Sequence, residues 1–368
     1  MRKILLRMKV VVTGGGTGGH IYPALAIASA LSETGADILF VGSAHGPEGA
    51  LARKHGFEFV SVASGPIYGL SYRTAVSTLK LAAGSIAARR IIGDFKPDVL
   101  IGTGGYTCAG VLLAGWSCGK RIVLHEQNVV PGRTNRLLSR FARRICVTFE
   151  ESKRYFPESR VVVTGLPVRK DIIEGIDRYQ AAGRFGLDGG RPTVLVIGGS
   201  QGALRINNLI LEALPLLCEN GVQIIHQTGE CGYEDAAALN PDAQGYVVMP
   251  YIEDMAAAYS AADVVVSRAG ASAISEITVR GLPSVLIPYP YAQGDHQSKN
   301  AQALANVGAA LAVDEKEIDG KSLAAILLDL FNDGSRLRSM AEASRRLAKP
   351  NAAVDVAKVV IETAFTER

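Results

Sequence analysis

Short runs of β-branched and aliphatic residues alternate along the chain with longer segments whose apolar residues recur at helical spacing. Such alternation is typical of parallel α/β sheets, in which a helix follows each buried strand. In the first half the pattern predicts strands at 10–12, 38–41, 59–62, 98–101, 121–124 and 161–163. In the second half it predicts strands at 193–197, 222–226, 246–248, 263–266 and 284–287.

The two halves of the chain repeat one arrangement. Residues 10–20 form a strand and a glycine-rich loop that lead into a helix predicted at 21–31, with Pro23 in its first turn. Residues 193–202 repeat the strand and the glycine loop. In such sheets ligands bind beyond the carboxyl ends of the strands, so we expect a site in these loops.

Chain length and this duplication together predict two domains. A chain of 368 residues exceeds what a single core usually fills. We expect an α/β fold with two Rossmann-like domains, 1–168 and 169–350, facing each other across a cleft and joined by a linker near 165–171. A helix predicted at 352–364, within the segment 351–368, is expected to pack back on the first domain.

The net charge of +4 hides an asymmetry between the two predicted domains. Residues 1–168 contain 21 Lys and Arg against 10 Asp and Glu, whereas residues 169–368 contain 18 against 25. A basic half joined to an acidic half indicates that the first faces an anionic partner, such as a membrane surface or a phosphorylated substrate. The alternative is an ordinary solvated surface. No nucleic-acid partner is expected.

Cysteine usage and the first residues bear on the compartment. The five cysteines are scattered and never spaced as Cys-x-x-Cys, which argues for a reducing compartment and against disulfides or a zinc site. Arg7 and Lys9 interrupt the N-terminal apolar run, so no signal peptide is expected. Since no apolar run reaches the ~18 residues of a membrane span, we expect a soluble or peripheral protein.

The first glycine loop, Gly14-x-Gly16-x-x-Gly19, has the spacing of the dinucleotide-binding fingerprint. That fingerprint also needs an acidic residue at the end of the second strand, where it binds ribose hydroxyls. Here the second predicted strand ends in Gly42-Ser43, so neither a nicotinamide nor a flavin cofactor is expected. His20, at the mouth of the loop, becomes the candidate for chemistry.

Several segments at strand ends carry polar residues in combinations that resemble the GT-B glycosyltransferases. The matching segments are Gly14-Gly-Gly-Thr-Gly-Gly-His20, Gly104-Gly-Tyr106, His125-Glu-Gln-Asn128 with Asn135, Gly165-x-Pro-Val-Arg169, Gly198-Gly-Ser-Gln-Gly202, and Ser267-Arg-x-Gly-Ala271 with Glu276. The resemblance covers essentially the whole chain. Within this family the chain is similar to the bacterial enzymes that add N-acetylglucosamine to the lipid-linked muramyl-pentapeptide precursor of peptidoglycan.

The resemblance implies a site for UDP-N-acetylglucosamine (UDP-GlcNAc), position by position. In it Glu276 takes the ribose hydroxyls, Ile252 holds uracil through its backbone, and Ser200 and Arg169 bind the diphosphate. Asn128, Ala271 and Gln297 contact the sugar, although the Asp295-His296-Gln297 loop departs from the family pattern. Thr17, Gly18 and Gly19 close over the reacting centre. The alternative for Glu276 is an ordinary exposed helix glutamate.

His20 is the candidate general base, because an incoming sugar hydroxyl must lose its proton and a histidine titrates near neutral pH. The alternative is that His20 caps or orients the loop. Tyr106 and Glu126 are rival residues, and with Asn135 they form the acceptor-side candidates. The chain contains no Asp-x-Asp sequence, so we expect no metal or other cofactor and assign the leaving diphosphate to Arg169 and backbone N–H groups.

A segment at 69–90 mixes apolar and basic residues and predicts a membrane-facing surface. It contains Leu70, Tyr72, Val76, Leu79 and Ile86 among Arg73, Lys80, Arg89 and Arg90. Trp116 and a second basic series follow, comprising Arg133, Arg136, Arg140, Arg143 and Arg144. An apolar patch with a basic rim is how a peripheral protein rests on an anionic bilayer. The alternative is plain core plus solvated surface.

The expected function is therefore inverting transfer of N-acetylglucosamine from UDP-GlcNAc to the C4 hydroxyl of lipid I, which yields lipid II. The protein would act at the cytoplasmic face of the bacterial inner membrane, as a peripheral enzyme. Two alternatives use the same scaffold: a glycosyltransferase for another lipid acceptor, and a UDP-GlcNAc 2-epimerase. A non-catalytic two-lobed sugar-binding protein is the alternative from a different class.

Overall fold

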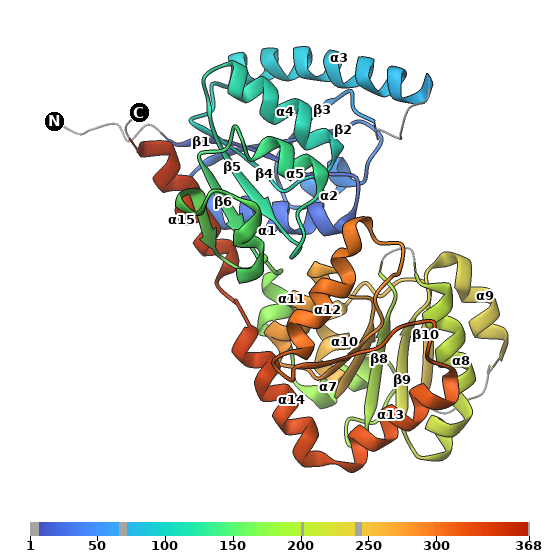
Figure 1. Ribbon diagram of the computed structural model, residues 1–368. Helices are drawn as coiled ribbons and strands as arrows, with labels where there is room; N and C mark the ends of the chain where they lie inside the picture. Colours follow the sequence, from blue (N-terminus) through green and yellow to red (C-terminus); the bar gives the residue numbers. More distant parts are fainter. Residues whose placement is uncertain (1–6, 66–71, 200–201, 240–244, 367–368) are drawn as a thin grey trace. The chain divides into compact units, whose positions relative to one another are not determined.

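The computed structural model describes residues 7–65, 72–199, 202–239 and 245–366 (Figure 1). The chain divides into two compact units. Unit 1 comprises residues 1–168 and 351–368, and unit 2 comprises residues 169–350. Each unit is an α/β domain built on its own parallel sheet.

Within the described residues of unit 1, seven parallel strands form one sheet in the order β3-β2-β1-β4-β5-β6-β7. The strands are β1 (Lys9–Thr13), β2 (Asp37–Ser43), β3 (Glu58–Val62), β4 (Val99–Gly102), β5 (Arg121–Glu126), β6 (Arg144–Val147) and β7 (Val161–Val163). The helical segments are α1 (Gly18–Glu33), α2 (Glu48–Lys54), α3 (Tyr72–Phe95), α4 (Tyr106–Ser117), α5 (Arg133–Leu138), η1 (Glu150–Tyr155), η2 (Glu158–Arg160) and α15 (Ala352–Phe365). The order of the first six strands is that of a Rossmann sheet.

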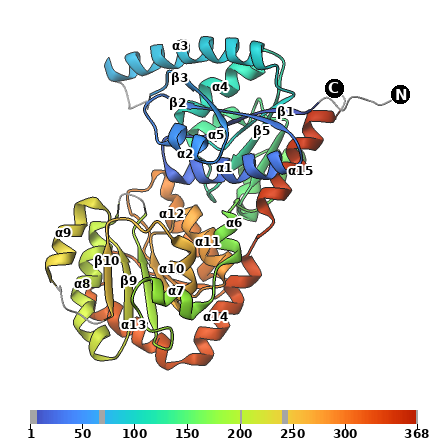
Figure 2. The same ribbon diagram turned by 180° about the vertical axis from the view of Figure 1, so that it is seen from behind.

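Alternation of side chains along β1 builds a core on each face of this sheet. Val10 and Val12 pack in one cluster with α1 and α15, whereas Val11 packs in the other with α3 and α4. Figures 1 and 2 show these two helix layers on opposite sides of the strands. Because both faces are covered, the central strands β1 and β4 are buried, mostly apolar runs, as is typical of parallel sheets.

The C-terminal helix α15 belongs to unit 1 although it follows unit 2 in sequence. Val356 and Val360 are fully buried in the core cluster that contains Ile27 and Leu31 of α1. Arg121, at the start of β5, donates a hydrogen bond to the carbonyl of Ala364. The helix thereby completes the layer that covers one face of the first sheet.

Within the described residues of unit 2, six parallel strands form a second sheet in the order β10-β9-β8-β11-β12-β13. The strands are β8 (Thr193–Ile197), β9 (Gln223–Gln227), β10 (Tyr246–Met249), β11 (Val264–Ser267), β12 (Ser284–Leu286) and β13 (Ala310–Ala312). The helical segments are α6 (Lys170–Glu174), α7 (Arg178–Arg184), α8 (Leu204–Glu219), α9 (Glu230–Leu239), α10 (Met255–Ala261), α11 (Ala271–Arg280), η3 (Gln293–Asp295), α12 (His296–Ala305), α13 (Gly320–Asn332) and α14 (Gly334–Leu347). Its main core joins β8 and β11 to α8 and α13.

The structure differs from the sequence predictions at three places. Strands β6 and β13 were not predicted, because their short apolar stretches follow arginines in one case and consist of Ala-Leu-Ala in the other. Helix α1 begins at Gly18 and not at residue 21, which puts His20 in its first turn and Pro23 inside the helix. Glycine has a low helix propensity, so Gly18 and Gly19 predict a loop. In the structure they belong to the first turn of the helix.

Candidate active site

Two glycine-containing loops meet at the carboxyl ends of the neighbouring strands β1 and β4. A Cβ atom on Gly14 would lie 2.0 Å from the hydroxyl oxygen of Thr103, and one on Gly105 would lie 2.3 Å from the carbonyl oxygen of Gly15. The backbone of Gly105 therefore packs directly on the backbone of Gly15, and the backbone of Gly14 packs on the Thr103 side chain, which only glycine permits. This is also where the strand order reverses, the usual ligand site of such sheets.

Replacing Gly105 with alanine is expected to lower activity at least tenfold and to lower the melting temperature. Gly105 has a φ of 86° and a close backbone neighbour, so a methyl group there strains the loop and pushes it off Gly15. The measurement is the rate of the reaction expected from the sequence, alongside thermal unfolding. Gly93→Ala, in α3 with open space around it, is the matched control and should keep both. Wild-type activity in Gly105→Ala would show that the loop contact does not matter.

His20 is held by the second loop through two hydrogen bonds. Its Nδ1 lies 2.9 Å from the carbonyl oxygen of Thr103, and the Thr103 hydroxyl donates to the carbonyl of His20 over 2.8 Å. A carbonyl can only accept, so Nδ1 carries the proton and Nε2 is the basic nitrogen. Gln127 Nε2 donates to the same Thr103 carbonyl over 2.6 Å, which fixes the acceptor. The imidazole is thus oriented as a general base requires.

Glu126 ends β5 and is almost fully buried. Its Oε1 accepts from the backbone N–H of Asn128 over 2.9 Å, and its Oε2 accepts from Asn135 Nδ2 over 2.9 Å and from the N–H of Gly132 over 3.2 Å. Burial raises the pKa of Glu126, and these donors oppose the rise. Both oxygens are therefore engaged in holding the loop from Asn128 to Gly132, a structural task for a buried carboxylate.

The structure gathers the candidates of unit 1 at one end of the sheet. A Cβ on Gly104 would lie 3.1 Å from the His20 ring and 3.4 Å from Asn135 Nδ2. One on Gly16 would lie 3.1 Å from the Tyr106 ring. Thr17 is the N-cap of α1 and makes no side-chain capping bond, and Gly18 and Gly19 form the first turn. The N–H groups of a first helical turn suit a negatively charged ligand.

Glu48 is a buried residue at this end that sequence reasoning missed. It is 0% exposed, its Oε1 accepts from the N–H of Ser43 over 2.8 Å, and it would lie 2.5 Å from a Cβ on Gly15. The carboxylate therefore supports the glycine loop from behind. The sequence feature that could have identified Glu48 is a carboxylate shortly after the second strand. It lies five residues beyond the end of β2, whereas the dinucleotide fingerprint expects an acidic residue at the strand end itself.

Glu276 is the main candidate residue of unit 2. It lies on α11, and Tyr259 of α10 donates a hydrogen bond to its Oε2 over 2.9 Å. Burial raises the pKa of Glu276, while the nearby charge of Arg169 and the Tyr259 bond lower it. Arg169 directly precedes α6, and Ala271 begins α11. Helices α6 and α11 pack together, which brings Arg169, the residue before α6, near Glu276 and Ala271 on α11.

Gln227 connects two other loops of unit 2 and was also missed from the sequence. Its Nε2 donates to the carbonyl of Gly199 over 3.0 Å, and its Oε1 accepts from the N–H of Ile252 over 3.1 Å. Because the N–H of Ile252 already donates to Gln227, the backbone contact with uracil expected at Ile252 would be made by its carbonyl oxygen. The sequence feature that could have identified Gln227 is its place as a polar residue at the end of a strand. The same feature drew attention to residues 125–128.

The remaining donor-site candidates are Gln297 and Asn128 for the sugar and Ser200 for the diphosphate. Gln297 lies in the first turn of α12, and its Oε1 accepts from the N–H of Tyr289 over 2.9 Å. Asn128 is half-buried beside Glu126. Ser200 lies outside the described residues.

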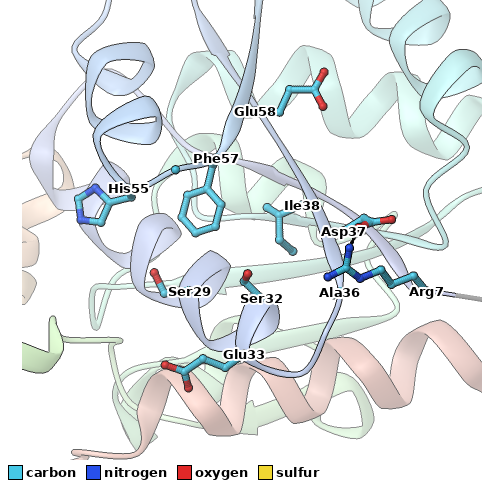
Figure 3. Close-up of a pocket in the computed structure, with 11 residues that line it drawn as sticks. Arg7, Ser29, Ser32, Glu33, Ala36, Asp37, Ile38, His55, Phe57 and Glu58 are labelled. Carbon is cyan, nitrogen blue, oxygen red and sulfur yellow. Dashed lines mark ion pairs between the residues drawn. The ribbon is translucent and has the colours of Figure 1, made fainter.

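A pocket of about 470 Å³ lies elsewhere in unit 1 (Figure 3). Its lining includes Asp37, the first residue of β2, and Glu58, the first residue of β3, together with Glu33 near the end of α1. Arg7 spans 3.1 Å to Asp37 at its edge. These residues sit at the amino ends of the strands, the opposite end of the sheet from His20, so this pocket is not part of the site.

Comparison with known proteins gives consistent matches. The glycosyltransferase family 28 N-terminal domain matches residues 10–147, and the family 28 C-terminal domain matches residues 193–358. A relative from Halothermothrix orenii is 41% identical over 97% of this chain and 99% of its own; it is named UDP-N-acetylglucosamine–N-acetylmuramyl-(pentapeptide) pyrophosphoryl-undecaprenol N-acetylglucosamine transferase. The crystal structure of Acinetobacter baumannii MurG matches with a TM-score of 0.76 and 31% identity, over 96% of this chain and 99% of that one. A Listeria monocytogenes protein described as a putative UDP-N-acetylglucosamine 2-epimerase shares the fold, with a TM-score of 0.73 and 14% identity over 98% of each chain.

Proposed function

Because the chain belongs to glycosyltransferase family 28, we propose that it transfers N-acetylglucosamine from UDP-GlcNAc to the C4 hydroxyl of the N-acetylmuramyl residue in lipid I. The product is lipid II, the disaccharide precursor of peptidoglycan. The observation that carries this proposal is a 41% identity, over nearly the full length of both chains, to a relative that bears the name of this transferase.

The donor is assigned to unit 2. Glu276 accepts hydrogen bonds from the vicinal ribose hydroxyls, and the carbonyl of Ile252 accepts from the N3–H of uracil. Arg169 and Ser200 bind the diphosphate, and Ala271 and Gln297 contact the sugar. Asn128, which belongs to unit 1, is proposed as a further sugar contact. A guanidinium suits a diphosphate because it forms charge-assisted hydrogen bonds in pairs. The orientation of Glu276 by Tyr259 supports the ribose assignment.

The acceptor is assigned to unit 1, where His20 acts as the general base. Nε2 of His20 takes the proton from the C4 hydroxyl as that oxygen bonds to C1 of the donor sugar. The bond between C1 and the β-phosphate oxygen breaks, and UDP leaves with the electron pair. Arg169 and the backbone N–H groups of Thr17 to Gly19 stabilise the charge of the leaving group. Attack from the opposite face inverts the anomeric centre, as in inverting glycoside chemistry.

A release assay for UDP distinguishes this function from its alternatives. Purified protein with UDP-GlcNAc and lipid I is expected to release UDP, and protein with UDP-GlcNAc alone is expected to release almost none. An epimerase converts the sugar nucleotide without lipid I, and a transferase for another lipid leaves lipid I unchanged. A sugar-binding protein turns over neither substrate. Failure to release UDP with both substrates present contradicts the proposal.

The membrane contact is assigned to a patch on α3, α4 and α5. We define the α3–α5 patch as the exposed apolar residues Ile86, Trp116 and Leu137 with the basic Arg89 and Arg136. Arg89 donates to the Ser117 hydroxyl over 3.1 Å, which ties α3 to the end of α4. None of the helices in the described part of the chain is long and apolar enough to cross a bilayer. The apolar candidates 70, 72, 76 and 79 lie outside the described side chains.

An apolar patch with a basic rim supports peripheral binding at the cytoplasmic face of the inner membrane, where lipid I is reached from the water side. The double variant Ile86→Ser/Leu137→Ser is expected to lower binding to vesicles with anionic lipid at least tenfold, because each change removes an apolar side chain from the bilayer. Vesicle sedimentation measures it. The control Val307→Ser/Val354→Ser removes two exposed apolar residues elsewhere. Equal binding by both variants would place the membrane contact outside this patch.

A further inference from the structure

The hydroxyl of Tyr259 makes a contact that the transfer chemistry itself does not use. Tyr259 is 1% exposed and is among the largest fully buried side chains of the protein. Its hydroxyl lies 2.9 Å from Oε2 of Glu276, on the neighbouring helix α11. A buried phenol needs a hydrogen-bond partner, and this one has a carboxylate.

That bond restricts what the carboxylate of Glu276 can do. A glutamate side chain has several rotatable bonds, and immobilising it on binding a ligand costs conformational entropy. The phenol occupies a lone pair of Oε2 and holds the carboxylate in one orientation before any ligand arrives. Two adjacent hydroxyl groups then meet acceptor oxygens that are already in place. Preorganisation of this kind raises affinity without any contact between Tyr259 and the ligand.

The charge of Glu276 depends on the groups that face it. Burial raises its pKa, and Asp171 on α6 adds to the rise, while Arg169 and the Tyr259 hydroxyl oppose it. Burial and the adjacent carboxylate raise the pKa of Tyr259 well above its usual range, so the phenol stays a donor. Loss of the hydroxyl therefore removes one of the groups that lower the pKa of Glu276, and the pKa of Glu276 rises further.

We propose that Tyr259 is a positioning residue for donor binding, whose hydroxyl fixes the carboxylate of Glu276 in the orientation that receives the ribose 2′ and 3′ hydroxyls. This inference rests on the proposed function, in which Glu276 binds the ribose. It adds a residue of α10 that acts on donor binding through Glu276 and does not itself contact the donor. It also accounts for a large aromatic residue whose polar atom points at a functional carboxylate.

The test compares Tyr259→Phe with Tyr246→Phe. Tyr246 lies on β10 in the same unit, is also buried, and its hydroxyl lies 3.0 Å from Nδ1 of His226. Each variant deletes one buried, hydrogen-bonded hydroxyl and keeps the ring. Affinities for UDP and for 2′-deoxy-UDP are measured by calorimetry. We expect Tyr259→Phe to weaken UDP binding about tenfold and 2′-deoxy-UDP binding much less, whereas Tyr246→Phe changes neither.

Kinetics and pH give further readouts that a merely structural role would not move. In Tyr259→Phe the KM for UDP-GlcNAc rises and kcat at saturating donor stays within about twofold, since the ribose contact is made equally in ground and transition states. The pH below which UDP affinity falls is also expected to be higher in Tyr259→Phe, because the lost hydrogen bond lowers the pKa of Glu276 in the wild type. In a Glu276→Ala background the same substitution has no further effect on UDP affinity, because its influence passes through that carboxylate.

The outcomes separate the two levels of the proposal. If the wild-type protein discriminates UDP from 2′-deoxy-UDP and Tyr259→Phe discriminates equally well, the positioning role of Tyr259 is wrong. An equal loss of affinity for both nucleotides, or the same loss in the Glu276→Ala background, also overturns it. If the wild-type protein itself binds the two nucleotides equally, the ribose assignment of Glu276 fails and the Tyr259 inference falls with it.

Discussion

Replacing His20 with alanine is expected to lower kcat about a thousandfold and to leave the KM for UDP-GlcNAc within about twofold. A positioned general base contributes roughly 10²- to 10⁴-fold to rate, and the acceptor hydroxyl loses its proton only in the transition state. The hydrogen bond from Nδ1 to the Thr103 carbonyl makes Nε2 the basic nitrogen. Steady-state kinetics with varied donor at saturating lipid I measure both constants.

A matched control for this substitution is available in the same unit. His55 is exposed, and its Nδ1 lies 2.9 Å from the carbonyl of Leu51. Alanine there should leave kcat unchanged. If His20→Ala weakens donor binding and turnover to the same degree, His20 orients the loop instead of taking a proton. A kcat close to that of the wild type would exclude it as the base.

Glu276→Ala is expected to raise the KM for UDP-GlcNAc about a hundredfold with a small change in kcat. The variant removes two hydrogen bonds to a charged acceptor, each worth about 1.5 kcal/mol or more. Donor affinity should also fall as pH decreases, and because burial raises the pKa of Glu276, the fall should begin at higher pH than for an exposed glutamate. UDP binding by calorimetry across pH measures this.

Glu234→Ala, on α9 in the same unit, is the control for Glu276→Ala, since this exposed carboxylate lies away from α11. It should bind UDP as the wild type does over the whole pH range. If Glu276→Ala keeps the wild-type donor KM, an ordinary helix glutamate is the better description of Glu276. A pH dependence that persists in Glu276→Ala would mean that another group titrates.

The fold was largely predictable because buried parallel strands leave strong sequence signals. Runs of β-branched residues such as Val10 to Val12 and Val264 to Val266 favour a strand that is covered on both faces, and these valines are fully buried. The comparisons confirm the family and the two-domain α/β architecture. The exact start of α1 was not predictable, since Gly18 and Gly19 have a low helix propensity and yet lie in its first turn.

The candidate site was predictable only where its residues lie at strand ends or at the start of the helix that follows. Glu126 ends β5, Tyr106 begins α4, and His20 lies in the first turn of α1. The parallel order of β1, β4 and β5 brings the three to one edge of the sheet. The residues that hold other candidates in place were not visible in the sequence, because each pair is widely separated along the chain. Tyr259 reaches Glu276 from another helix, and Gln227 reaches Ile252 from another strand. No local pattern encodes such pairs.

The chemistry of the product tests the central claim most directly. Purified protein is incubated with lipid I and UDP-GlcNAc labelled with ¹³C at C1 of the sugar, in the presence of EDTA, and the product is examined by NMR. A disaccharide lipid with a β linkage from C1 to C4, formed with one UDP released per disaccharide, is the predicted result. An α linkage, a different acceptor position, or no disaccharide despite intact donor and acceptor would contradict inverting transfer to lipid I.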